Sequence, residues 1–291
     1  MEAKIILVLM VKNESAILQR CLAAAAPFCD AIVVADTGST DATLEIAMEF
    51  SCSDKPVHIV TDEWKNFGWN RSLSLKAARA WAEELTWNLS EAYALVLDAD
   101  MCILGSPEAL RKFLTEAKPS GAQLLQMHGN MEYSNVRLMR LSDGWFCEGV
   151  THEYWAGGGD TPFITEARIH DIGDGGAKAD KFERDERLLL AGLQEKPTCE
   201  RYMFYLAQTY HCTNRHAEAI RWYEKRIQAG GWVEEVWYSH YMLVCNYLKL
   251  GRPYEAELWA QRGLDLQPDR PEAIMQLVAK SPNTTRRGIT Y

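Results

Sequence analysis

The chain has 291 residues and a mass of 33.0 kDa, enough for one large domain and a smaller one. Hydrophobic residues make up 47% and charged residues 24%, which excludes a disordered chain and a fibrous protein. The net charge of -9 is uneven, because residues 1–177 carry -11 and residues 178–291 carry +2. The acidic first part argues against a polyanion-binding surface and suits a domain that places carboxylates around a metal ion.

The longest apolar run near the start, Ile5–Val11, is far shorter than the roughly 20 residues that a membrane helix needs. We therefore expect no signal peptide and no membrane span. The eight cysteines are scattered without the spacing of a zinc site, which indicates reduced thiols in a cytoplasmic protein.

Short apolar runs alternate with helix-length amphipathic segments in the first part of the chain. In order, the sequence predicts a strand at Ile5–Val11, a helix at Ser15–Ala26, a strand at Ile32–Ala35, a helix at Asp41–Phe50, a strand at Val57–Val60, a helix at Asn70–Trp87 and a strand at Ala92–Leu97. This alternation is typical of right-handed βαβ crossovers, so the predicted class is α/β with a mainly parallel sheet. Ligands of such sheets bind at the carboxyl ends of the strands.

The region after Asp180 contains helix formers and no strand-like run. A shift of 37 residues aligns Tyr210, Arg215, Glu218, Ala219 and Trp222 with Tyr247, Arg252, Glu255, Ala256 and Trp259. Each unit is expected to be a pair of helices that approach closely at the small alanine, and it resembles a tetratricopeptide repeat. We predict domains at 1–178 and 179–280 and a flexible tail at 281–291. The repeats are expected to pack on a helix at Lys181–Gln194 and on the first domain.

Asp98 and Asp100 follow directly after the predicted buried strand that ends at Leu97. Residues two apart in an extended chain point to the same side, so these carboxylates converge where a parallel sheet presents its ligands. Such a pair can hold a hard divalent cation, and the cation can neutralise a diphosphate. About one such triplet is expected by chance at this composition, so its place at a strand end supports the prediction.

Asp36 follows the strand Ile32–Ala35 and begins a turn that leads into a helix. Its carboxylate either satisfies the amides of this turn or, with Thr37, hydrogen-bonds a base or ribose edge. The residues leave both interpretations open.

Four motifs, in this order and spacing, resemble family 2 glycosyltransferases with the GT-A fold, a Rossmann-type mixed sheet domain. They are Val11-Lys12-Asn13-Glu14, the segment 33–41 with Asp36-Thr37, Asn70-Arg71, and Leu97-Asp98-Ala99-Asp100. The resemblance covers the first 100 residues well and extends loosely to about His170. Some relatives carry tetratricopeptide-like helices. The resemblance implies a nucleotide-sugar donor, usually a uridine diphosphate (UDP) sugar, a Mn²⁺ or Mg²⁺ ion, and inversion by direct displacement.

The resemblance also implies roles for single residues. The nucleotide sugar would be lined by Val11, Asn13, Glu14, Asp36, Thr37, Asn70, Arg71, Asp98 and Ala99. Asp98 would contact the ribose or the metal, and Asp100 would bind the metal. His170, which follows Phe163–Ile169, would complete the metal's ligands as a neutral imidazole, against the alternative of an isolated histidine at a strand end. Thr37 departs from the family pattern, since many relatives have an acidic residue there.

The segment Gly149-Val150-Thr151-His152-Glu153 resembles the Gly-x-x-His-Glu segment of repeat-bearing relatives, where the acidic residue lies near the acceptor. An inverting transfer needs a base that takes the acceptor's proton. We predict Glu153 as this base and His152 as its reserve, against the alternative that both only hydrogen-bond within a loop. Lys181 and Arg184, one helical turn apart, would face the leaving diphosphate, although a solvated helix face explains them almost as well.

These observations favour a metal-dependent inverting glycosyltransferase that acts on a hydroxyl or thiol. Its acceptor is open between a saccharide, a lipid-linked glycan, a peptide and a modified nucleobase, and its repeats would contact the acceptor, a protein partner or a second copy. A non-catalytic peptide-binding protein with a degenerate first domain is the alternative. A nucleotidyltransferase is a third, but it would present a Gly-rich basic loop where this chain has Lys12-Asn13-Glu14-Ser15.

Overall fold

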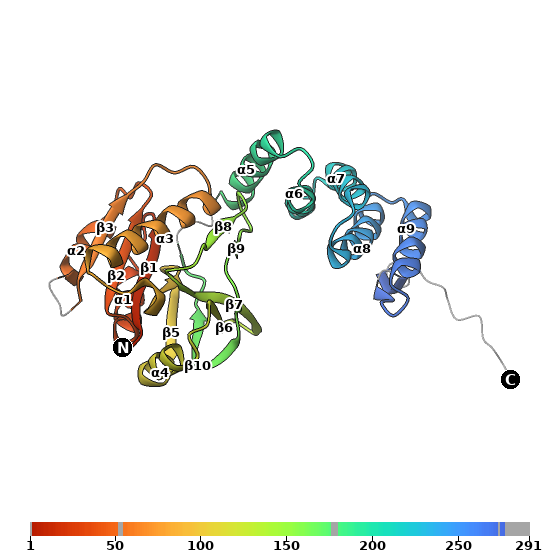
Figure 1. Ribbon diagram of the computed structural model, residues 1–291. Helices are drawn as coiled ribbons and strands as arrows, with labels where there is room; N and C mark the ends of the chain where they lie inside the picture. The colour runs from red at the N-terminus through yellow and green to blue at the C-terminus, as the bar shows by residue number, and fades with distance from the viewer. Residues whose placement is uncertain (1, 52–54, 176–179, 273, 277–291) are drawn as a thin grey trace. The chain divides into compact units, whose positions relative to one another are not determined.

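The computed structural model describes residues 2–51, 55–175, 180–272 and 274–276. The chain divides into two compact units, Met1–Ala179 and Asp180–Tyr291 (Figure 1). The predicted boundary at residue 178 and the predicted tail at 281–291 lie outside the described residues. No helix in the described ranges is long and apolar enough to cross a membrane.

The first unit is built on one large mixed sheet. Its strands are β1 (Lys4–Val11), β2 (Ala31–Asp36), β3 (Val57–Thr61), β4 (Ala92–Leu97), β5 (Met101–Gly105), β6 (Gly121–His128), β7 (Met131–Arg140) and β10 (Phe163–Asp171), with a separate hairpin of β8 (Phe146–Glu148) and β9 (Tyr154–Ala156). The order across the sheet is β3-β2-β1-β4-β7-β6-β10-β5, in which β3, β2, β1 and β4 are parallel and β7 is antiparallel to β4. The predicted α/β class is confirmed.

Both faces of this sheet are covered by helices. The helices are α1 (Leu18–Ala25), α2 (Thr43–Ser51), α3 (Phe67–Glu84) and α4 (Pro107–Ala117). Along β1, Leu7 and Leu9 pack with α1 and α4 on one face, while Ile6 and Val8 pack with α3 on the other. A strand buried on both faces has a continuous apolar sequence, which is why β1 was predictable. Figure 1 shows α3 lying over β1 and β2.

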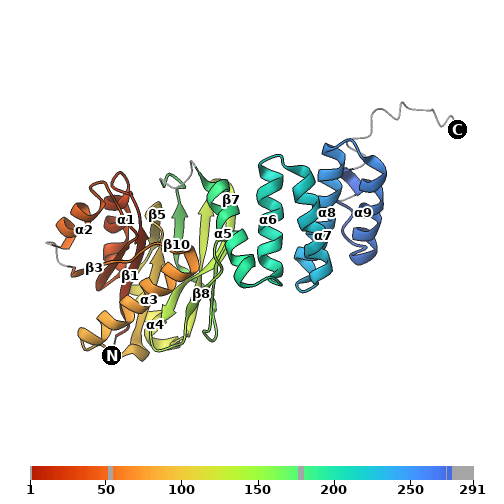
Figure 2. The same ribbon diagram turned by 90° about the horizontal axis from the view of Figure 1, so that it is seen from above.

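The second unit is all-helical. It contains α5 (Lys181–Glu195), α6 (Glu200–Cys212), α7 (His216–Ala229), α8 (Val233–Lys249) and α9 (Pro253–Leu266). Each helix packs on the next along the chain, and Figure 2 shows α6 to α9 standing side by side. The predicted helix at Lys181–Gln194 is α5, and it packs on α6 as expected. The helical region after the sheet domain is confirmed.

Equivalent residues of the two repeat units make the same contacts. The Arg215 guanidinium lies 4.3 Å from the centre of the Tyr210 ring, and Arg252 lies 4.9 Å from that of Tyr247. The turn residues Asn214 and Gly251 both have positive φ, at 59° and 70°. The same local interactions therefore end one helix and start the next in both pairs, so the sequence repeat is a structural repeat.

The small alanine in each repeat is expected to set the stability of the helix pair. Ala219 on α7 is fully buried, so Ala219→Leu forces extra volume into a packed interface and should lower the free energy of unfolding by about 1–3 kcal/mol. Ala217→Leu, at an exposed position of the same helix, is the matched control and should change it by less than about 0.5 kcal/mol. Urea unfolding followed by circular dichroism measures both. Equal effects of the two variants would contradict close packing at Ala219.

Candidate functional site

The turn after β2 is held by the carboxylate of Asp36. This side chain is 2% exposed and accepts hydrogen bonds from the Gly38 and Ser39 amides at 3.0 and 3.1 Å. Thr37 donates from both its amide and its hydroxyl to the Val11 carbonyl, at 3.0 and 3.1 Å. The structure thus gives Asp36 the turn-forming role that the sequence left open. A contact of Asp36, Thr37 or Val11 with a nucleoside stays a prediction.

The loop after β1 is hydrogen-bonded to the loop after β2. Asn13, which has a φ of 57°, accepts from the Thr40 amide at 2.7 Å. The Glu14 amide donates to the Thr43 hydroxyl at 2.8 Å, and that hydroxyl donates to Asp41 at 2.5 Å. These bonds hold the loops after β1 and β2 together, next to the carboxyl end of β4.

A single guanidinium connects the strand end of β4 with the predicted base. Arg71, on α3, is 12% exposed; its Nη2 donates to Asp98 Oδ1 at 2.7 Å and its Nε to Glu153 Oε1 at 2.7 Å. The second Asp98 oxygen lies 3.6 Å from Arg137 Nη1. Burial alone would raise the pKa of Asp98, but the charges of Arg71 and Arg137 lower it overall. Asp98 is therefore an ionised carboxylate held between two arginines.

Asp100 has a different environment from Asp98. Burial, followed by the nearby carboxylates of Asp98 and Asp171, raises its pKa. The backbone of Asp171 is placed by β10, which pairs with β5 so that Asp171 faces Met101 in register. Two negatively charged side chains thus approach Asp100. Ala99, between the two aspartates, is 5% exposed and belongs to the apolar core.

The predicted trio of metal ligands is not brought together. His170 is exposed, and alternation along β10 places it on the opposite face of the sheet from the buried Ile169 and from Asp171. Within the described ranges, no three or more His, Cys, Asp and Glu side chains are grouped so that they could hold a metal ion. Asp171 lies beside Asp100 at this edge, since the following amide, that of Ile172, donates to the Asp100 carbonyl at 3.1 Å.

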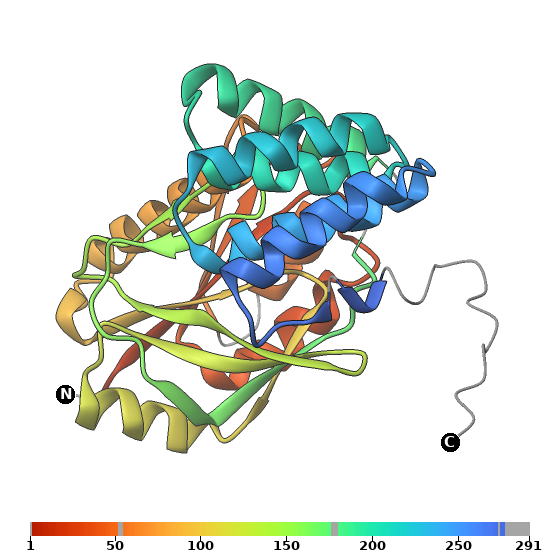
Figure 3. The same cartoon turned by 90° about the vertical axis from the view of Figure 1, so that its right-hand side faces the viewer.

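The sequence analysis missed Gln126, Arg137 and Asp171. Gln126 on β6 is 2% exposed and continues the inward series of Ala122 and Leu124, so its amide at a core position was a usable signal. Asp171 lies two residues after the buried Ile169 on β10, so it too continues an inward-facing series. Arg137 on β7 offered no such signal, because its partners come from other strands. Figure 3 shows the β6–β7 hairpin that carries Gln126 and Arg137, in yellow-green.

The segment that carries Glu153 is fixed on the first turn of α3. The Phe67 and Gly68 amides donate to the carbonyls of Val150 and Gly149, at 3.2 and 3.0 Å. These are amides that a helix start leaves without intrahelical partners, so the segment serves as their cap. His152, with a φ of 52°, turns the chain toward Glu153. The position of Glu153 therefore depends on the start of α3.

Gly68 permits this contact because it has no side chain. A Cβ at this position would lie 2.4 Å from the Gly149 carbonyl oxygen, so Gly68→Ala should displace the segment and lower kcat by about tenfold or more. Gly144→Ala is the control, since its Cβ would meet nothing closer than 3.7 Å. Donor hydrolysis by the two variants, with thermal unfolding in parallel, measures the difference. Full activity of Gly68→Ala would contradict this placement of Glu153.

Asn70, a predicted donor contact, holds a neighbouring loop. It is 1% exposed; its Oδ1 accepts from the Lys65 and Asn66 amides at 2.9 and 3.2 Å, and its Nδ2 donates to the Glu63 carbonyl at 3.0 Å. Both acceptor sites of the amide are thereby used. A contact of Asn70 with the donor stays a prediction.

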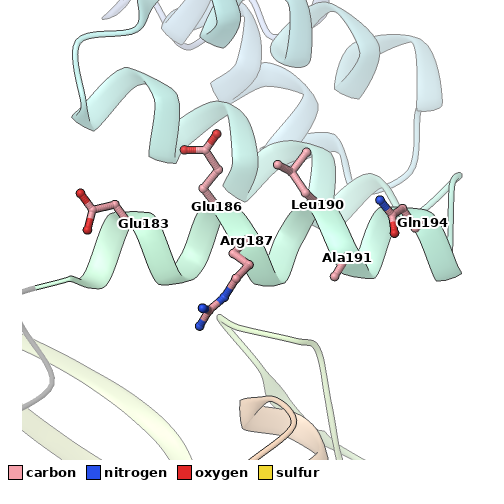
Figure 4. Close-up of a pocket in the computed structure, with 6 residues that line it drawn as sticks. All are labelled: Glu183, Glu186, Arg187, Leu190, Ala191 and Gln194. Carbon is pink, nitrogen blue, oxygen red and sulfur yellow. The ribbon is translucent and has the colours of Figure 1, made fainter.

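Lys181 and Arg184 belong to α5 of the second unit, and Arg184 Nε lies 3.6 Å from Asp185. A hollow of about 450 Å³ lies along the same helix, lined by Glu183, Glu186, Arg187, Leu190, Ala191 and Gln194 (Figure 4). The figure shows Glu186 and Arg187 projecting to different sides of α5. The predicted role of Lys181 and Arg184 at a diphosphate stays a prediction.

The first unit is thus an α/β domain with an acidic pair at a strand end, which Arg71 connects to Glu153. The family model described as "Glycosyl transferase family 2" matches residues 6–166, more than half of the chain. The chain belongs to this family and is a glycosyltransferase, as the four motifs predicted. A comparison with curated proteins finds no match.

Two solved structures are similar to part of the chain. One, entitled "Crystal structure of YrrB: a TPR protein with an unusual peptide-binding site", has 22% identity and a TM-score of 0.31, and the similarity covers 36% of this chain and 52% of that one. The other is the N-terminal domain of stress-induced protein-1 from C. elegans, at 18% identity and a TM-score of 0.34, covering 38% of this chain and 91% of that one. The chain thus matches about half the length of YrrB.

Proposed function

We propose that this protein transfers a sugar from a nucleotide-diphosphate donor to a hydroxyl or thiol, with inversion at the anomeric carbon. The proposed donor is a UDP-sugar. The observation that carries the proposal is the arrangement of Asp98, Asp100, Arg71 and Glu153 beside the carboxyl ends of β1, β2 and β4. A donor site and a candidate base are thereby linked through one side chain.

The residues around Asp100 fit a divalent cation. Asp100 is partly buried beside Asp98 and Asp171, and a cation would offset this accumulation of negative charge. Mg²⁺ bound with nucleotides is usually held by one or two carboxylates together with phosphate oxygens and water, so a set of three protein ligands is not required. Asp100 and Asp171 would hold the ion, with Asp98 fixed by its arginines. When bound, the cation would neutralise the leaving diphosphate.

Glu153 is the residue that would take the acceptor's proton. Its side chain is 16% exposed, so a group from the solvent side can reach it. The Arg71 Nε donates to Glu153 Oε1 at 2.7 Å and orients this carboxylate, whose other oxygen would take the proton. His152 stays the reserve base.

A panel of nucleotide sugars tests the proposal. Purified protein is incubated with each donor and Mn²⁺, and the products are identified by mass spectrometry. One donor cleaved well above the others would support a glycosyltransferase and identify its sugar. Cleavage of none, together with no calorimetric binding of any nucleotide sugar with or without Mn²⁺, would contradict the proposal and favour the non-catalytic peptide-binding alternative.

The acceptor supplies the nucleophile of the proposed transfer. The second unit supplies a repeat surface, and its helices would contact the acceptor, a protein partner or a second copy. A saccharide, a lipid-linked glycan, a peptide and a modified nucleobase all contain a suitable nucleophile. The donor panel, repeated with one acceptor of each class, separates them by the mass of the product.

A further inference from the structure

Two residues outside every motif connect the carboxylates of this site. Arg137 on β7 is 9% exposed and Gln126 on β6 is 2% exposed. Burial of a charged group and of an amide is unfavourable unless both are hydrogen-bonded. Their partners therefore indicate what they do.

Arg137 contacts Asp98 and Gln126 at once. Its Nη2 donates to Gln126 Oε1 at 2.8 Å, and its Nη1 lies 3.6 Å from Asp98 Oδ2 and 3.5 Å from the Val96 carbonyl. A guanidinium is planar and rigid, so the positions of these partners depend on one another. Since Arg71 holds the other Asp98 oxygen, the carboxylate is fixed from both sides.

Gln126 hydrogen-bonds Arg137 through its oxygen and Asp171 through its nitrogen. Its oxygen faces the Arg137 guanidinium, which only donates hydrogen bonds, so its nitrogen must face the other way. That nitrogen donates to Asp171 Oδ2 at 2.9 Å and to the Tyr133 hydroxyl at 2.8 Å. Arg137 thus sets the orientation of the amide that holds Asp171 Oδ2, while His128 Nδ1 lies 3.3 Å from the other oxygen, Asp171 Oδ1.

We propose that Arg137 and Gln126 are positioning residues of the donor site, which fix Asp98 and Asp171 so that Asp100 and Asp171 meet the cation of the donor together. Asp98 and Asp171 bring like charge near Asp100, so their carboxylates need fixed partners to stay close to it. Outer partners that orient metal-binding carboxylates commonly affect affinity by about 10- to 100-fold. The inference rests on the proposed function and names residues that it did not assign.

The test uses Gln126→Met, which keeps the side chain's length but removes its hydrogen bonds, and Arg137→Lys, which keeps the charge but cannot form the fork. Mn²⁺ affinity is measured by electron paramagnetic resonance with UDP or GDP present, and donor hydrolysis gives KM and kcat. We expect the Kd for Mn²⁺ to rise by about tenfold or more in both variants. The donor KM should rise with it, and kcat at saturation should change less, because binding is what the two residues arrange.

Two controls separate positioning from general damage to the sheet. Gln123→Met makes the same chemical change on the same strand, where the amide donates to Thr161, and Tyr133→Phe leaves Gln126 bonded to Asp171. Both should keep the wild-type Mn²⁺ affinity within about twofold, with the fold checked by circular dichroism. If Gln126→Met does not fold, Gln126→Asn, which shortens the reach of the amide, replaces it.

The results test the positioning role and the proposed function separately. Wild-type protein that binds UDP or GDP with Mn²⁺, together with folded Gln126 and Arg137 variants of unchanged Mn²⁺ affinity and donor KM, overturns the inference alone. A wild-type protein that binds neither nucleotide with Mn²⁺ overturns the proposed function and the inference together. Weaker Mn²⁺ binding in Gln123→Met, equal to that in Gln126→Met, also overturns the positioning role.

Discussion

We expect Asp100→Asn to reduce donor turnover by about 1,000-fold or more, because the cation loses its carboxylate and the leaving diphosphate loses several kcal/mol of charge stabilisation. The substitution keeps the shape of the side chain and removes only its charge. Hydrolysis of the preferred nucleotide sugar, assayed over a range of Mn²⁺ concentrations, measures the loss. Retained activity in excess Mn²⁺ would contradict the assignment of Asp100 to the metal.

The same variant should be at least as stable as the wild type in metal-free buffer. Burial and the carboxylates of Asp98 and Asp171 raise the pKa of Asp100, so the folded state binds its proton more tightly than the unfolded state. At pH values above the pKa of Asp100 in the folded state, its ionised carboxylate therefore lowers the free energy of unfolding. This destabilisation disappears at pH values below 3.8, the ordinary pKa of the group. Urea unfolding with EDTA should show a larger advantage of Asp100→Asn at about pH 7 than at about pH 3. Clear destabilisation of the variant at pH 7 would contradict this reading of Asp100.

The second large effect is expected at Glu153. Glu153→Gln still accepts the hydrogen bond from Arg71 Nε but cannot take a proton, so kcat should fall by about 100- to 10,000-fold. The donor KM should stay within about twofold, because the donor site is unchanged. Donor hydrolysis as a function of pH measures both constants, with water serving as the acceptor.

Glu148→Gln is the matched control for this variant. Glu148 ends β8, five residues before Glu153, and its carboxylate accepts from the Tyr154 hydroxyl at 3.0 Å. It should retain wild-type kcat. A large loss in His152→Ala with none in Glu153→Gln would transfer the role of base to His152.

Much of the first unit could be predicted because its signals are local. The strands β1, β2 and β4 are short apolar runs buried on both faces, and the segments between them have helical periodicity. Asp98 and Asp100 follow β4 directly, so the chain itself places them at the carboxyl ends of the parallel strands. The repeat in the second unit was equally visible, since Tyr210, Arg215 and their counterparts interact within a few residues of one another.

The partners of these residues were not visible, because they depend on strand order. Arg71 and Glu153 are 82 residues apart, and they meet because the segment after β8 caps α3. Arg137 reaches Asp98 only because β7 lies beside β4, and Asp171 reaches Asp100 because β5 pairs with β10 at the far side of the sheet.

Local propensity and the order of the motifs were thus enough to place an acidic pair at a strand end and to identify a glycosyltransferase. They could not tell His170 from Asp171, since which of two adjacent residues on β10 faces the site depends on how that strand packs. They also could not show that Asp98 lies between two arginines, whereas the charged groups that act most strongly on Asp100 are the carboxylates of Asp98 and Asp171. Charge pairing acts through space over a few ångströms, so it was settled by the folded sheet and not by the order of residues along the chain.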